Sequence, residues 1–132
     1  MERDILYKLD EWKASPYRKP LILKGARQVG KTWALKEFGS TRYRNCVYVS
    51  LEEIAPGVPG EYAQLFETTR DPKRVITNLS FAVGQPIDPG ETLVILDEIQ
   101  DCPAAVGMLK YFCDEAPEYH IACAGSLLGV RL

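Results

Sequence analysis

The sequence predicts an α/β fold in which helices cover both faces of a parallel sheet. Short apolar runs alternate along the chain with longer segments of helical spacing, as expected where a crossover helix follows each strand. Residues 93–96 are apolar without interruption, which is typical of a strand buried on both faces. Breaks rich in glycine or proline separate these segments.

Four strands are predicted from the apolar runs. They are expected at residues 21–24, 45–52, 92–98 and 119–126. The first of them, LILK, is short and is expected to be buried. The third, TLVILDE, contains the four-residue apolar run LVIL and ends in two acidic residues.

Five helices are predicted from apolar residues at helical spacing. They are expected at residues 4–13, 31–39, 61–69, 71–84 and 103–116. In the first helix, Ile5, Leu9 and Trp12 recur at i, i+4 and i+7, so one face should pack. Gly39 is expected to end the second helix.

The last two helices carry proline signals at their starts. Asp71 is expected to cap the fourth helix, with Pro72 in its first turn. Pro103 is expected to open the fifth helix. The residues expected to face the core from this helix are Val106, Leu109 and Cys113.

Composition indicates one soluble, cytoplasmic domain over residues 1–132. A helix and turn should occupy residues 1–20 and the core residues 21–132. No apolar run approaches the ~18 residues that cross a bilayer, and the start lacks the apolar segment of a signal peptide. The four cysteines form no C-x-x-C pair, so we expect reduced thiols and no zinc site.

Charge is unevenly distributed along the chain. Residues 1–44 carry a net charge of +6 and residues 45–132 a net charge of −8. Lys24, Arg27 and Lys31 fall in the basic part and would give a glycine-rich loop a positive field that suits an anion. The overall charge of −2 argues against nucleic acid as the partner.

That loop, GARQVGKT at residues 25–32, fits the phosphate-binding pattern G-x-x-x-x-G-K-[ST]. An accidental match is disfavoured, because the four fixed positions arise by chance in under ~1% of chains this long. Lys31 is expected to reach the β- and γ-phosphates of a nucleotide, and Thr32 to ligate Mg²⁺. The residues expected to bind phosphate are Gly25, Ala26, Arg27, Gln28, Val29, Gly30, Lys31 and Thr32.

Acidic and polar residues end two of the predicted strands, at the edge where ligands of open α/β sheets bind. Asp97 is expected to hold Mg²⁺, directly or through water, and Glu98 to accept a proton from the attacking water. Ser126 is expected to orient that water or contact the γ-phosphate, with a simple turn residue as the alternative. The expected catalytic residues are therefore Glu98, Lys31 and Ser126.

Three segments together resemble the AAA-like prokaryotic ATPases that carry a C-terminal domain of unknown function. They are GARQVGKT, LVILDEIQDCP and LKYFCDEAPEYHIACAGSLLGV. The resemblance implies a three-layer P-loop NTPase of the ASCE type, with sheet order 5-1-4-3-2, that binds ATP and Mg²⁺. By motif match it implies phosphate and metal binding by Gly25, Gly30, Lys31 and Thr32, metal binding by Asp97, a water contact by Glu98 and a sensor role for Ser126.

The predicted strands correspond to strands 1–4 of that order, so we expect a truncated core that lacks the C-terminal domain of the full-length protein. Residues 21–24 would then form an apolar sheet edge, which invites pairing with another chain. A homo-oligomer formed through this edge is therefore expected, unless the N-terminal helix covers it.

The sequence favours binding and Mg²⁺-dependent hydrolysis of ATP. One alternative is a slow nucleotide-dependent switch, which would retain its nucleotide. A second is a DNA-associated ATPase, whose binding would weaken steeply with salt. A third, a small-molecule kinase, needs a lid and an acceptor pocket, and the second carboxylate, Glu98, argues against it.

Overall fold

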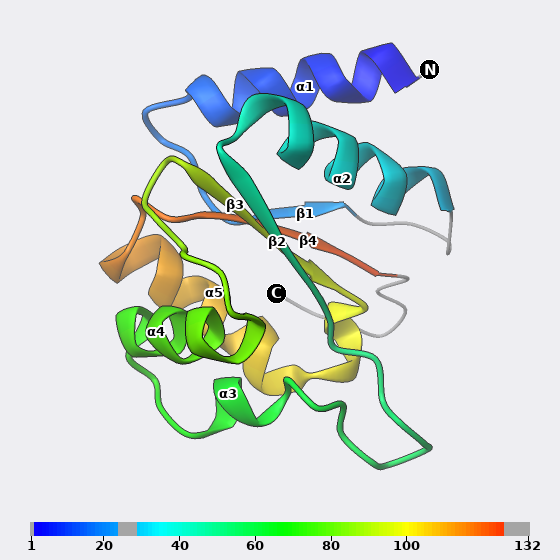
Figure 1. The fold of residues 1–132 in the computed structure, drawn as a ribbon, viewed down its shortest axis with the longest axis vertical. Helices are drawn as coiled ribbons and strands as arrows, with labels where there is room; N and C mark the ends of the chain where they lie inside the picture. The colour runs from blue at the N-terminus through cyan, green and yellow to red at the C-terminus, as the bar shows by residue number, and fades with distance from the viewer. Residues whose placement is uncertain (1, 24–28, 126–132) are drawn as a thin grey trace.

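The computed structural model describes residues 2–23 and 29–125, which form a three-layer α/β fold (Figure 1). All strand pairs are parallel, and the sheet order is β1-β4-β3-β2. The strands are β1 (Leu21–Leu23), β2 (Asn45–Ser50), β3 (Thr92–Asp97) and β4 (His120–Ala124). This arrangement confirms the predicted parallel sheet and its 1-4-3-2 order. The edge strand β1 is half-buried rather than buried, because a neighbouring strand covers it on one side.

Helices α1 and α2 cover one face of the sheet, and α3, α4 and α5 cover the other (Figure 1). The helices are α1 (Glu2–Ala14), α2 (Val29–Arg42), α3 (Gln64–Glu67), α4 (Pro72–Val83) and α5 (Pro103–Glu115), with the short 3-10 helix η1 (Ile99–Asp101) before α5. Within the described ranges, each helix is too short or too polar to cross a lipid bilayer.

Alternate residues of β3 divide between two hydrophobic cores. Leu93 and Ile95 point toward α1 and α2, whereas Val94 and Leu96 point toward α3, α4 and α5. Because both faces are covered, every residue of β3 is buried. The strand can therefore present Asp97 to a ligand only at its carboxyl end.

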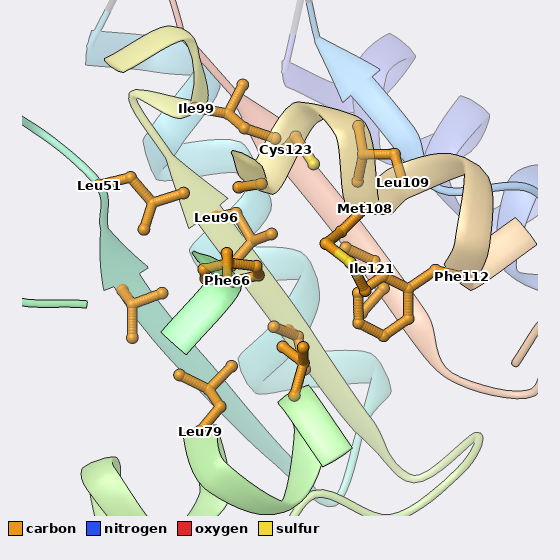
Figure 2. Close-up of a cluster of buried hydrophobic side chains, with 14 of the residues drawn as sticks. Leu51, Phe66, Leu79, Leu96, Ile99, Met108, Leu109, Phe112, Ile121 and Cys123 are labelled. Atoms are coloured by element: carbon orange, nitrogen blue, oxygen red, sulfur yellow. The ribbon is translucent and has the colours of Figure 1, made fainter. Parts of the chain in front are cut away.

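The larger core lies between the sheet and α3, α4 and α5 (Figure 2). The buried residues of α5 are Ala105, Met108, Leu109 and Phe112. Three residues of this helix are predicted from the sequence to face the core. Leu109 is buried as predicted, whereas Val106 and Cys113 are only half-buried. The helix is rotated so that a stripe at i, i+3, i+4 and i+7, which includes the bulky Met108 and Phe112, meets β3 and β4.

Helix α4 begins and ends as its local sequence predicts. The Asp71 carboxylate accepts a hydrogen bond from the Lys73 backbone N–H at 3.1 Å, and Pro72 occupies the first turn. Gly84 ends the helix in the left-handed conformation, with φ 71°. The preceding helix, α3, is shorter than the expected 61–69 and covers four residues.

The prediction that Gly39 ends the second helix is wrong, because α2 continues to Arg42. Gly39 is buried where α2 lies on the sheet. A Cβ atom at this position would overlap the Sγ atom of Cys46 on β2 and lie 3.2 Å from Leu93 Cδ2. The glycine therefore allows a close approach of helix and sheet, which the local sequence does not reveal.

A Gly39→Ala variant should lose about 1–3 kcal/mol of unfolding free energy through overpacking, although alanine favours a helix by about 1 kcal/mol. The matched control is Gly107→Ala in α5, where a Cβ atom would meet nothing within 4 Å. This control should gain about 0.5–1 kcal/mol. Urea denaturation measures both, and equal stabilisation of the two variants would contradict the close approach at Gly39.

A buried polar pair lies at the amino end of β4. The Tyr43 hydroxyl and His120 Nδ1 are 2.6 Å apart, and the Trp12 ring meets His120 edge-on with centroids separated by 5.7 Å. Burial, helped by the cations Arg18 and Lys13, lowers the pKa of His120 to about 4. The folded protein therefore holds His120 neutral at physiological pH.

Folding stability should consequently fall on acidification between pH 6.5 and about 4. The ordinary pKa of histidine is 6.5, so within this window the unfolded chain binds more protons than the folded one. The His120 contribution is complete above pH 6.5 and is lost as the pH falls toward 4. Thermal unfolding followed by circular dichroism should show a smaller acid-induced decrease in Tm for His120→Asn than for wild type. Equal decreases would contradict the burial of a neutral imidazole.

Candidate active site

The carboxyl end of β3 and the first turn of α2 meet at one edge of the sheet. The Thr32 hydroxyl Oγ1 lies 3.3 Å from Asp97 Oδ2, although the two residues are 65 positions apart in the sequence. These are the two residues that the sequence motifs predict as metal ligands. The fold therefore brings the two predicted ligands into direct contact.

The Asp97 carboxylate is surrounded by hydrogen-bond donors. Its Oδ1 accepts the Glu98 backbone N–H at 2.9 Å, and its Oδ2 accepts the Tyr48 hydroxyl at 2.5 Å as well as the Thr32 hydroxyl. Asp97 is only 8% exposed. A buried carboxylate requires such donors, because it has lost its hydration.

Tyr48 reaches Asp97 from the neighbouring strand. Its backbone is aligned with Ile95, two residues before the end of β3, and its side chain extends to the strand end. The Lys36 ammonium lies 4.0 Å from the centroid of the Tyr48 ring, which fixes the ring through a cation–π contact. Burial and the hydrogen bond to Asp97 raise the pKa of Tyr48, so its hydroxyl remains a donor.

Glu98 follows Asp97 with a left-handed backbone conformation. Its φ of 51° is the one positive value found for a non-glycine residue in the described part of the chain. This conformation costs about 1–3 kcal/mol for a residue with a side chain. Glu98 Oε1 accepts a hydrogen bond from Gln100 Nε2 at 2.7 Å. The hydrogen-bond donor identified for Glu98 therefore differs from those identified for Asp97.

The remaining predicted site residues fall into two groups. Val29, Gly30, Lys31 and Thr32 form the first turn of α2, so the helix begins within the glycine-rich motif. The free N–H groups of a helix N-terminus favour an anion there. Five predicted residues lie outside the residues that the structure describes: Gly25, Ala26, Arg27, Gln28 and Ser126.

The donors at this edge fit Mg²⁺. A hydroxyl and a carboxylate are hard oxygen ligands, and Mg²⁺ commonly takes one or two protein ligands while water and substrate phosphates complete its shell. Thr32 and Asp97 provide that pair. Residues 2–23 and 29–125 contain no cluster of three or more His, Cys, Asp and Glu side chains that could hold a metal ion alone.

Tyr48 and Gln100 are site residues that the sequence motifs do not reveal. A weak signal exists for Tyr48, because it is a polar-tipped residue near the end of a strand expected beside the acidic pair. No signal exists for Gln100 beyond its position two residues after Glu98. Both contacts depend on tertiary geometry rather than on spacing in the sequence.

A parallel sheet with a helix starting in a G-x-x-x-x-G-K-T motif and an aspartate at the facing strand end defines a P-loop NTPase domain. A family model described as AAA domain matches residues 17–131. The chain therefore belongs to the AAA domain family, and nucleotide binding is the property that this family implies. No curated protein and no solved structure matched the chain.

Removing the Tyr48 hydroxyl should destabilise the fold by about 1 kcal/mol, because the buried Asp97 carboxylate then loses one of its hydrogen-bond donors. The variant is Tyr48→Phe, which keeps the ring beneath Lys36. The control is Tyr17→Phe, where the ring is 86% exposed, and its stability should change by less than ~0.5 kcal/mol. Urea denaturation distinguishes the two, and identical midpoints would contradict the importance of the Tyr48–Asp97 bond.

Proposed function

We propose that this domain binds ATP with Mg²⁺ and hydrolyses it. The observation that carries the proposal is the approach of Thr32 to Asp97 at the start of α2. In P-loop NTPases these two positions provide the protein ligands of the nucleotide-bound metal. Membership of the AAA domain family supports the same class of ligand.

Phosphate binding is assigned to the glycine-rich motif and to the helix that it opens. Lys31, in the first turn of α2, would contact the β- and γ-phosphates. The net charge of +6 over residues 1–44 gives this part of the chain a field that attracts the anion. Mg²⁺, when bound, would supply positive charge to the phosphate oxygens. The backbone ligands proposed for phosphate are those of Gly25, Ala26, Arg27, Gln28, Val29 and Gly30.

Hydrolysis is assigned to Glu98. Water would attack the γ-phosphorus, the bond from that phosphorus to the β–γ bridging oxygen would break, and Glu98 would take the proton from the water. Glu98 and Asp97 accept hydrogen bonds from different side chains, which supports giving one acid to the metal and the other to water. Ser126 is the proposed contact to the γ-phosphate or to the attacking water.

Two further proposals concern the cellular location and the oligomeric state of the protein. All four cysteines are free thiols, which supports placement of the protein in the reducing cytoplasm.

Strand β1 pairs with β4 on one side and lies at an edge of the described sheet. Association with a second copy of the chain through this edge is the proposed mode of oligomerisation.

Lys31→Ala should abolish binding of ATP–Mg²⁺, whereas Glu98→Gln should bind ATP as wild type does and lose turnover by about 100-fold or more. Titration with a fluorescent ATP analogue measures binding, and phosphate release measures turnover. Lys110→Ala, on the exposed side of α5, is the charge-matched control and should behave as wild type. Normal turnover by Glu98→Gln would contradict the base assignment, and wild-type binding without release of ADP would support the slow switch instead.

A further inference from the structure

The Gln100 side chain connects Glu98 to the end of β4. Its Nε2 donates a hydrogen bond to Glu98 Oε1 at 2.7 Å. Its amide also lies against Gly125, the residue that follows β4, because a Cβ atom built on Gly125 would overlap Gln100 Oε1 and lie 3.2 Å from its carbonyl carbon. The amide therefore fills the space between the carboxyl ends of β3 and β4.

The charge of Glu98 fixes which way this amide faces. An ionised carboxylate accepts hydrogen bonds but cannot donate them, so Nε2 must face Glu98 and Oε1 must face Gly125. Gln100 Oε1 is buried and has no hydrogen-bond partner among the described residues. Such an acceptor is unfavourable, and an apolar side chain of similar length would avoid the penalty. The amide is thus better explained by its action on Glu98 than by a contribution to stability.

Gly125 is required for this arrangement. Any side chain at position 125 would occupy the place of the Gln100 carbonyl and displace the amide from Glu98. Gly125 is not among the described glycines with positive φ, so steric room explains this glycine better than backbone conformation does. The glycine and the glutamine therefore act together on one carboxylate.

We propose that Gln100 is a positioning residue that orients the Glu98 carboxylate toward the attacking water, and that Gly125 leaves the space in which it does so. This inference rests on the proposed hydrolysis, since it gives Glu98 the role of general base. Gln100 acts through Glu98 and is assigned no contact with nucleotide. A general base must be held within a fraction of an ångström of its working position, which a second hydrogen-bonded residue can ensure.

The test is Gln100→Met, which keeps the length of the side chain and removes the donor. Its kcat for ATP hydrolysis should fall on the order of 10- to 100-fold, while KM for ATP and the affinity for the fluorescent analogue stay unchanged. The urea midpoint should not decrease, because the unpaired Oε1 is removed as well. The matched control is Gln64→Met on the exposed side of α3, which should leave kcat unchanged.

Two double variants separate positioning from a general structural effect. In a Glu98→Gln background, Gln100→Met should cause no further loss, because the base on which it acts is already gone. Gly125→Ala should reproduce the loss in kcat, and in a Gln100→Ala background it should add nothing, because the space is then free. If Gly125→Ala does not fold, the Gln100→Met series still decides the question.

The possible failures are distinguishable. If wild type releases phosphate no faster than Glu98→Gln, the proposed hydrolysis is wrong and this inference is overturned with it. If wild type turns over ATP and Gln100→Met matches it, the inference alone is overturned. It is also overturned if Gln100→Met loses as much activity in the Glu98→Gln background as in wild type, or if the loss is a change in KM alone.

Discussion

Strand β3 is paired along both edges and buried on both faces, and the rest of the structure depends on this one strand. Its side chains alternate between the two hydrophobic cores, so the helices on either face of the sheet pack against it. Its end is equally constrained, because β2 and β4 hold its register from both sides. Asp97 therefore has a fixed position, and its charge, buried at that position, requires the donors of Tyr48, Thr32 and the Glu98 backbone.

The two acids at the end of β3 illustrate how adjacent carboxylates can be given separate tasks. Glu98, whose backbone is left-handed, accepts a hydrogen bond from Gln100, whose amide lies against Gly125 after β4. Asp97 instead accepts hydrogen bonds from Tyr48 on β2 and from Thr32 on α2. The hydrogen bonds at this strand end thus give the proposed metal ligand and the proposed base different identified partners.

The parts of this structure that sequence reasoning anticipates are those decided locally or by a motif. The cap at Asp71 and Pro72, the uninterrupted apolar strand and the start of a helix in the glycine-rich motif all follow from neighbouring residues. The parts it misses depend on distant packing. Gly39 lies mid-helix because Cys46 needs the room, and the buried face of α5 is set by the sheet below it rather than by apolar spacing alone. The contacts of Tyr48 and Gln100 are missed for the same reason, since their partners are set by the tertiary arrangement.

The positions of the two tryptophans have an optical consequence. Trp12 lies edge-on to His120 between α1 and the sheet, whereas Trp33 directly follows Thr32 on α2 and is 46% exposed. Intrinsic fluorescence therefore contains one signal from the docking of α1 and another from the edge of the sheet where nucleotide is proposed to bind. A protonated imidazole quenches indole emission, so protonation of His120 would dim the Trp12 signal. Replacing either tryptophan with phenylalanine would turn the natural protein into a label-free reporter of one of these two regions.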